Sequence, residues 1–188
     1  MGSDYHFFTV WRVAGTVNEV MEVLGDDESL TRWWPSVYLD VVRVADGDPD
    51  GGGRIVDVYT KGWLPYTLRW RMTITDAMDE SGFALSAAGD LVGHGQWTFS
   101  ADGPEVVIGY DWTVRAAKPL LRRLSWLLKP LFSANHRWAM AKGEDSLRLE
   151  LRRRRAAGRS GPSSAVPPPP PPTFWWLRGR RASRSGGR

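Results

Sequence analysis

The chain contains no cysteine, which excludes a disulfide framework, a thiolate nucleophile and a cysteine-ligated metal site. It also lacks an apolar run of about 18 residues, the length that a membrane-spanning helix requires. Its first residues, Met1 to His6, have neither the basic segment nor the apolar run of a secretory signal. These absences predict a cytoplasmic protein, because a cysteine-free chain suits a reducing compartment.

Histidine is scarce, and only His6, His94 and His136 occur in the 188 residues. No two of them have the spacing of metal ligands, and no His-Glu-x-x-His motif is present. The sequence also lacks a Gly-x-Ser-x-Gly motif, and the run Gly51–Arg54 lacks the Lys and Ser/Thr of a phosphate-binding loop. We therefore expect no metal site, no cofactor and no covalent catalysis.

Acidic residues are absent from residues 151–188, which contain ten arginines and so carry a charge of +10. Residues 1–150 contain 15 Lys and Arg and all 21 Asp and Glu, which gives them a net charge of −6. The overall charge of +4 therefore describes neither part. It does not indicate a nucleic-acid groove in the acidic part of the chain.

The composition divides the chain into a domain, residues 1–155, and a tail, residues 156–188. Pro, Arg, Gly and Ser dominate the tail and predict disorder, with a polyproline II segment at Pro167–Pro172. We expect no dedicated role for the tail, but its composition would also suit contact with three kinds of partner. Its arginines, with Trp175 and Trp176, suit weak binding to nucleic acid or to an anionic membrane, and its prolines suit an adaptor groove.

Tryptophan is abundant, and nine of the eleven tryptophans fall within the first 138 residues. This residue is difficult to bury completely because its indole N–H requires a partner. The excess therefore predicts the wall of an aromatic-lined cavity in addition to a solid core. The alternative is that each tryptophan is an ordinary bulky residue of the core.

The first half of the chain reads as one strand, two short helices and a series of strands. Residues 5–13 are rich in β-forming residues, and a helix follows from a cap at Thr16 to Gly25. A second short helix is expected to end before Pro35. Six further strands without an intervening long helix are predicted at residues 37–45, 54–61, 66–76, 83–89, 95–100 and 105–115.

Helical periodicity returns at Pro119, where leucines form an apolar stripe. Pro130 is expected to end or kink this piece, and a longer helix is predicted from Ser133 to Arg155, with a solvated end at Arg152–Arg155. The order of elements predicts an α+β fold. A curved antiparallel sheet of about seven strands would wrap around the C-terminal helix and leave a cavity between them.

Three segments resemble the START-like superfamily, also called SRPBCC, and in particular its polyketide cyclase/dehydrase-type domains. They are residues 13–37 (VAGTVNEVMEVLGDDESLTRWWPSV), 60–75 (TKGWLPYTLRWRMTIT) and 134–151 (ANHRWAMAKGEDSLRLEL). Thr16 stands where the family usually has proline. The resemblance covers residues 5–155 and implies a helix-grip fold. The family includes cyclases, aromatases, lipid carriers, hormone receptors and oxygenase domains, but the iron-binding cluster of the oxygenases is missing here.

The candidate ligand-binding residues are the aromatic and polar side chains that this pattern places near the predicted cavity. They are Trp11, Trp33, Trp34, Tyr59, Trp63, Tyr66, Trp70, Trp97, Trp112, His136 and Met140. Strict alternation in residues 66–76 places Tyr66 and Trp70 inward and therefore Arg69 and Arg71 outward.

Candidate catalytic residues are fewer, and they could support only acid/base chemistry. His136, Tyr66 and Tyr110 could transfer protons. The pattern of residues 54–61 does not decide which face of that strand is inward. If Asp57 points inward, burial would raise its pKa and make it a candidate base.

Three functions remain open from the sequence. The domain could bind a hydrophobic or aromatic small molecule, lipid-like or polyketide-like, in its cavity. It could instead be an enzyme similar to polyketide cyclases, which the resemblance implies. The tail could attach the protein to membrane or nucleic acid. The sequence gives no indication of the oligomeric state.

Overall fold

The computed structural model describes residues 5–116, 119–157 and 166–173, and of residues 116 and 119–129 it describes only the backbone. In chain order the elements are β1 (Tyr5–Ala14), α1 (Val17–Leu24), η1 (Asp27–Ser29), α2 (Leu30–Trp33), β2 (Tyr38–Ala45), β3 (Ile55–Lys61), β4 (Thr67–Ile74), β5 (Gly82–Gly89), β6 (Leu91–Asp102), β7 (Glu105–Ala116) and α3 (Pro119–Ala157).

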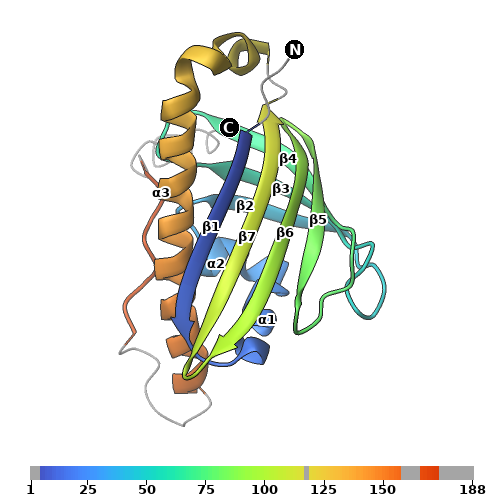
Figure 1. Cartoon of the computed structure of the whole chain (residues 1–188), viewed down its shortest axis with the longest axis vertical. Coiled ribbons are helices and arrows are strands. Elements are labelled where there is room, and N and C mark those ends of the chain that lie inside the picture. The colour runs from blue at the N-terminus through green and yellow to red at the C-terminus, as the bar shows by residue number, and fades with distance from the viewer. Residues whose placement is uncertain (1–4, 117–118, 158–165, 174–188) are drawn as a thin grey trace, which may run out of the picture.

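The strands form one seven-stranded sheet in the order β1-β7-β6-β5-β4-β3-β2. All six pairings are antiparallel. The sheet is strongly curved, and α3 runs along it beside β1, while α1 lies near the lower end and α2 lies above it (Figure 1). The predicted α+β, helix-grip architecture is therefore confirmed.

Two helical predictions differ from the structure in detail. The short second helix consists of a 3₁₀ turn, η1, followed directly by α2. The two predicted C-terminal helices are one element, α3, with Pro130 inside it. Figure 1 shows this helix bending near its N-terminal end. A proline inside a helix removes one backbone hydrogen bond and kinks the axis without ending the element.

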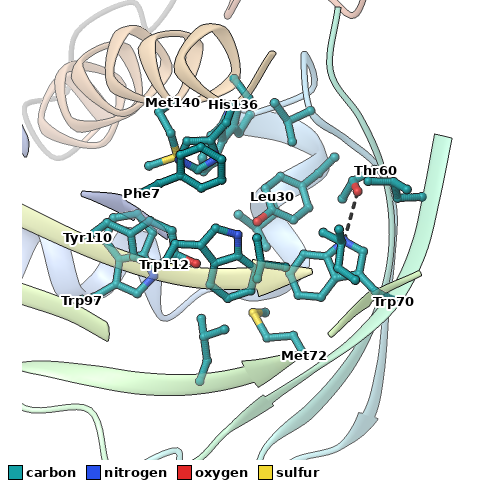
Figure 2. Close-up of a pocket in the computed structure, with 18 of the residues that line it drawn as sticks. Phe7, Leu30, Thr60, Trp70, Met72, Trp97, Tyr110, Trp112, His136 and Met140 are labelled. Carbon is teal, nitrogen blue, oxygen red and sulfur yellow. Dashed lines mark hydrogen bonds between the residues drawn. The ribbon is translucent and has the colours of Figure 1, made fainter. Parts of the chain in front are cut away.

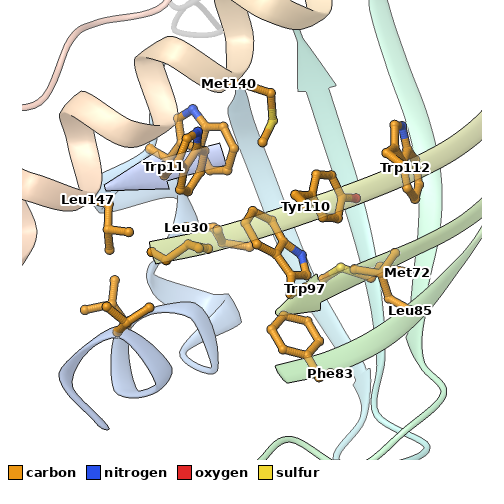
Figure 3. Close-up of a cluster of buried hydrophobic side chains, with 14 of the residues drawn as sticks. Trp11, Leu30, Met72, Phe83, Leu85, Trp97, Tyr110, Trp112, Met140 and Leu147 are labelled. Carbon is orange, nitrogen blue, oxygen red and sulfur yellow. The ribbon is translucent and has the colours of Figure 1, made fainter. Parts of the chain in front are cut away.

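The core lies on the concave face of the sheet, because strand residues alternate between the two faces. In β7 every second residue is buried, namely Val106, Ile108, Tyr110, Trp112 and Val114. Figure 3 shows how Trp11, Trp97 and Tyr110 from different strands gather under α3. Apolar side chains of the sheet, of α1 and α2, and of α3 form one continuous cluster.

Gly143 allows α3 to pack closely on the tryptophans of the core. A Cβ atom at this position would lie 2.4 Å from Cζ2 of Trp34 and 2.8 Å from Cη2 of Trp11. The Trp11 and Trp34 rings meet edge to face with centroids 5.6 Å apart. Two indole rings therefore occupy the space that a larger helix residue would require.

Helix α1 begins with the predicted cap at Thr16, whose hydroxyl accepts a hydrogen bond from the Glu19 amide at 3.3 Å. The Glu19 carboxylate accepts in return from the Thr16 amide at 2.8 Å, which completes a capping box. Arg155 on α3 donates to the same carboxylate at 2.6 and 2.8 Å. The start of α1 is thus fastened to the end of α3.

The basic end of α3 is anchored, so the prediction of a solvated end at Arg152–Arg155 is wrong for three of its four residues. Arg154 pairs with Asp26 at 2.9 Å and with Glu150 at 3.1 Å. Arg153 also pairs with Glu150. Glu150 precedes these arginines by one helical turn on α3, a spacing that local sequence does show, whereas only the fold brings Asp26 and Glu19 to the helix end.

Residues 166–173 lie on the domain as an extended segment beside α3 (Figure 1). Arg153 donates to the Pro167 carbonyl at 3.2 Å, and Lys61 donates to the Thr173 carbonyl at 2.7 Å. The rest of the tail beyond residue 157, including Trp175 and Trp176, lies outside the described residues, as do the side chains of the predicted apolar stripe as far as residue 129. The tail's disorder and its contacts with membrane or nucleic acid therefore stay predictions. In the part of the chain that is described, no helix is long and apolar enough to cross a membrane.

Candidate functional site

A cavity of about 220 Å³ lies between the concave face of the sheet, α3 and the short helices. Every strand and helix contributes to its wall. Figure 2 shows Phe7, His136 and Met140 on the α3 side, with Trp112, Trp70 and Met72 facing them from the sheet. Apolar and aromatic side chains form most of this wall, as the excess of tryptophan predicts.

Most of the predicted ligand-binding residues line this cavity. They are Trp34, Tyr66, Trp70, Trp97, Trp112, His136 and Met140, and the candidate proton donor Tyr110 joins them. Three of the rings form a stacked row on neighbouring strands: the centroids of Trp97 and Tyr110 are 4.0 Å apart, and those of Tyr110 and Trp112 are 5.7 Å apart. One side of the cavity is thus a continuous aromatic surface.

Four predicted ligand-binding residues lie elsewhere. Trp11 and Trp33 are 1% and 0% exposed and belong to the core around the cavity, where their indole N–H groups have no hydrogen-bond partner among the described residues. Trp63 is half-buried between β3 and β4 and is not part of the cavity wall. Tyr59 is on the outer face of β3, where the Arg69 guanidinium lies 4.1 Å from its ring centroid.

Asp57 is also on the outer face of β3, so the condition for a catalytic base at this position is not met. Val56 and Val58 are the buried residues of this strand. Arg71 donates to both carboxylate oxygens of Asp57, at 2.7 and 2.8 Å, and this pairing lowers the pKa of Asp57. Arg69 and Arg71 are exposed, which agrees with the alternation of β4.

The polar groups of the cavity wall are mainly neutral. The Trp70 indole donates to the Thr60 hydroxyl at 3.0 Å, as Figure 2 shows. Burial raises the pKa of Tyr66 to about 12, and it raises the pKa of the Tyr110 hydroxyl well above the ordinary value. Both phenols are therefore protonated near neutral pH. The Trp34 indole N–H is buried without a partner among the described residues.

His136 presents a neutral imidazole to the cavity. Its ring stacks on Phe7, with centroids 4.1 Å apart. Burial, assisted by the positive charge of Arg137, lowers the pKa of His136 to about 4. Its Nε2 atom is buried and has no hydrogen-bond partner among the described residues. A neutral ring nitrogen of this kind can exchange a hydrogen bond with a polar group of a ligand.

One charged group reaches the cavity wall from the short helices. Asp27, on η1, is 3% exposed. Its Oδ1 atom accepts a short hydrogen bond from Arg43. Arg54, which precedes β3, lies 3.8 Å from the Oδ2 atom, and both Asp27 and Arg54 line the cavity. Among the described residues there is no group of three or more side chains that could hold a metal ion.

No family model and no curated protein matches the sequence. Solved structures do match. TTHA0849 from Thermus thermophilus has 18% identity and a TM-score of 0.62 over 83% of this chain and 100% of that chain. The Zhui aromatase/cyclase from a Streptomyces species has 17% identity and a TM-score of 0.63, over 85% of this chain and 99% of that one.

A START superfamily protein from Mycobacterium smegmatis has 13% identity and a TM-score of 0.57 over 78% of this chain and 97% of that chain. The chain has the START-like fold. At these identities the likeness shows the fold alone. The residues that line the cavity must therefore be identified from this structure itself.

Several residues of the cavity wall are missing from the sequence-based predictions. Phe7 shares a face of β1 with Trp11, so the alternation of that strand could have indicated it. Asn135 adjoins His136 on α3 and accepts a hydrogen bond from the Leu64 amide at 3.2 Å. Asp27 is one of two possible caps of the predicted second short helix, Arg54 begins the predicted strand at residues 54–61, and no local pattern relates them.

Proposed function

We propose that the domain binds an aromatic small molecule in its central cavity. The observation that carries the proposal is the aromatic wall of this cavity, in which Trp97, Tyr110 and Trp112 form a stacked row. A cavity lined by apolar groups with a few oriented polar atoms is the usual form of a small-molecule site. Two of the residues that line the cavity, His136 and Trp34, have a buried ring nitrogen without a hydrogen-bond partner among the described residues.

The size of the cavity favours a compact ligand. Its volume of about 220 Å³ exceeds that of an engineered cavity of about 150 Å³ that binds benzene. It is smaller than the range of about 300–1,000 Å³ that holds drug-sized ligands. A molecule of two or three fused rings therefore fits better than a phospholipid, and flat rings suit the stacked indoles on the wall.

Fluorescence titration of the tryptophans tests this proposal, together with native mass spectrometry of protein purified from cells. Naphthalene, anthracene and oleate are suitable probes. We expect the two aromatic probes to change the emission, because Trp70, Trp97 and Trp112 line the cavity. Oleate should bind more weakly. If no probe changes the emission and no bound molecule is detected, the proposal is wrong.

A pair of substitutions on α3 provides a matched control. Ala139 lines the cavity, whereas Ala141 is exposed two residues further along the helix. Ala139→Phe should fill the cavity and abolish binding of anthracene, and Ala141→Phe should leave it unchanged. Equal binding by both variants would show that the probe binds outside the cavity.

A second candidate function is an enzyme of the cyclase type, which is supported by the neutral His136 facing the same cavity as Tyr66 and Tyr110. In an aldol cyclisation, a base removes a proton from the carbon beside one carbonyl. That carbon then bonds to a second carbonyl carbon, whose oxygen takes up a proton. Loss of water follows. His136 Nε2 could accept the first proton, and a tyrosine hydroxyl could donate the second.

Binding remains the first proposal because an imidazole with a pKa of about 4 is a weak base near neutral pH. The enzyme proposal predicts that a linear poly-β-ketone is converted to a cyclic product. His136→Phe and Tyr66→Phe should each lower the yield while naphthalene binding is retained. An unchanged yield in both variants would contradict these roles.

A further inference from the structure

The buried carboxylate of Asp27 is the one charged group that η1 contributes to the cavity wall. Its Oδ1 atom is satisfied by Arg43. Its Oδ2 atom is buried and has no hydrogen-bond partner among the described residues, and the nearest ion-pair contact, with Arg54, is 3.8 Å long. An unsatisfied buried carboxylate oxygen is costly, so a partner at this position would be strongly favoured.

Arg54 is held in place beside this oxygen. Its Nη1 atom donates to the Gly25 carbonyl at 2.8 Å, and its Nε atom donates to the Asp46 carbonyl at 3.4 Å. These described contacts use two of the five N–H donors of a guanidinium group. A buried acceptor that has no hydrogen-bond partner among the described residues and a fixed donor group thus lie side by side in two residues that line the cavity.

The charges around Asp27 select the chemistry of a ligand group. A cationic group would approach two guanidinium groups, those of Arg43 and Arg54. An anionic group would approach the Oδ2 atom of Asp27. A neutral hydroxyl avoids both conflicts, because it can donate its proton to Oδ2 and accept a hydrogen bond from Arg54.

The polar corner formed by Asp27 and Arg54 is separate from the polar end of the cavity where Lys61, Asn135 and His136 lie. Arg54 directly precedes β3, and Lys61 ends that strand, and both line the cavity. Asn135 lies beside the Lys61 end, since it accepts from the Leu64 amide, and His136 follows it on α3. A small ligand at the Asp27 corner would therefore be distinct from one that contacts His136.

We propose that Asp27 and Arg54 form a recognition site for a hydroxyl group, so that the domain selects hydroxylated aromatic molecules over their unsubstituted analogues. The inference rests on the proposed binding function and names the class of ligand. Its basis is the unused Oδ2 acceptor next to a positioned guanidinium group in an otherwise aromatic wall.

Titration with naphthalene and 2-naphthol, which differ by one hydroxyl, tests the proposal. We expect 2-naphthol to bind roughly tenfold to hundredfold more tightly, the range for a buried hydrogen bond to a charged group. Asp27→Asn should reduce this preference, because the amide removes the negative charge, and with it the charged Oδ2 acceptor and the ion pairs with the two arginines. Asp57→Asn is the matched control, since it removes a carboxylate that pairs with Arg71 on the outer face.

Each outcome decides one of the two proposals. Equal binding of the two probes by the unmodified protein would overturn the hydroxyl site and leave the binding function intact. No binding of either probe would overturn the binding function itself. A preference that is lost in His136→Phe but kept in Asp27→Asn would place the hydroxyl at the other end. If Asp27→Asn does not fold, Arg54→Met tests the other half of the site, because it removes the donor beside Oδ2 and should also reduce the preference for 2-naphthol.

An independent observation concerns the proline-rich segment 166–173. It begins where Arg153 donates to the Pro167 carbonyl, and it ends at the β3–β4 connection. There the Thr173 hydroxyl donates to the Gly62 carbonyl at 3.1 Å, and Lys61 donates to the Thr173 carbonyl at 2.7 Å. Pro169, Pro170 and Pro172 in the segment are partly buried. The segment therefore joins the end of α3 to the rim of the cavity, where Lys61 and Gly62 lie.

We infer that residues 166–173 act as a brace that holds the β3–β4 connection in place at the cavity rim. A polyproline segment is stiff and loses little conformational entropy on docking, so a few hydrogen bonds can fix it. The brace acts on residues 62–66, whose Leu64 amide is also held by Asn135.

Hydrogen exchange of the full-length chain tests the brace. Replacing Pro169 and Pro170 by glycine should accelerate amide exchange in residues 62–66 by about tenfold or more, because a flexible segment docks less favourably. Thr173→Val should give a smaller acceleration, and Thr98→Val, at an exposed position of β6, should give none. Unchanged exchange in the glycine variant would overturn the inference.

Discussion

The imidazole of His136 on α3 stacks on the ring of Phe7 on β1, with centroids 4.1 Å apart and an angle of 18° between the planes. The contact joins the C-terminal helix to the edge strand of the sheet. It also keeps the Nε2 atom of His136 buried without a hydrogen-bond partner among the described residues. A protonated ring would be poorly solvated here, so the folded state favours the neutral form.

This burial predicts that stability falls as the pH decreases. The pKa of His136 is lowered from 6.5 to about 4 in the folded protein, so between these values the unfolded chain binds a proton that the folded chain does not. The free energy of unfolding should therefore decrease as the pH falls from 6.5 toward 4, by up to about 3 kcal/mol. Urea unfolding at several pH values measures the change.

His136→Phe isolates this contribution from the carboxylates that also titrate at low pH. Phenylalanine can keep the stack on Phe7, and it removes the titrating group. The difference in unfolding free energy between the two proteins should shift in favour of the variant as the pH decreases. A difference that does not depend on pH would contradict the prediction.

Glu150 provides a second prediction, because it is 2% exposed and accepts from several arginines. Arg154 donates to it at 3.1 Å and Arg32 at 3.4 Å, and Arg153 donates as well. Removing one partner from a buried ionic group leaves the others uncompensated. We expect Glu150→Gln to lower the free energy of unfolding by about 2–3 kcal/mol, measured by urea denaturation.

The exposed pair of Asp57 and Arg71 is the natural comparison for Glu150. Both side chains are about half exposed, at 47% and 48%, so Asp57→Asn should cost less than about 1 kcal/mol. If Glu150→Gln and Asp57→Asn lower the free energy of unfolding equally, the burial of Glu150 does not add to the effect of its substitution.

The strands and their inward faces could be predicted wherever the sequence alternates clearly. In β4 the alternation places Trp70 inward and Arg71 outward, and the structure agrees. In β3 the alternation does not identify the inward face, because valines occupy one face while Asp57 and Tyr59 occupy the other. The pairing with β4 resolves this point, since Asp57 is opposite Arg71 and Val58 is opposite Trp70.

The polar corner of the cavity could not be predicted, because its members are distant in sequence. In the sequence Asp27 lies at the start of the second short helix, and Arg54 begins the strand predicted at residues 54–61. In the folded protein the Nη1 atom of Arg54 lies 3.8 Å from the Oδ2 atom of Asp27. Periodicity reports which face a residue occupies, but it contains no information on which distant charges meet.

The capping box of α1 gives a third prediction. Hydrogen bonds from Arg155, and then those from Thr16, lower the pKa of Glu19 to about 2 against the opposing effect of burial. Arg155→Met should raise this pKa toward its usual value and lower the free energy of unfolding by about 1 kcal/mol. NMR titration of the Glu19 carboxylate measures the pKa directly.

The stabilising effect of Arg155 should also depend on pH. A carboxylate with a lowered pKa contributes stability above its unfolded pKa of 4.5, and this is lost as the pH falls toward 2. The unmodified protein and Arg155→Met should therefore converge in stability at low pH. A constant difference between them would argue against an ionic contribution from this pair.

Gly143 gives the last prediction, in which two opposite effects compete. Glycine in a helix interior costs about 1 kcal/mol relative to alanine, so Gly143→Ala would be stabilising on an exposed helix. Here the added Cβ would lie 2.4 Å from the Trp34 ring and 2.8 Å from the Trp11 ring. Overpacking of this kind costs about 1–3 kcal/mol, and two packed indoles cannot move aside easily. We therefore expect a net decrease in the melting temperature, together with a change in Trp fluorescence as the rings shift. An increased melting temperature would mean that α3 can move away from the tryptophans without loss of stability.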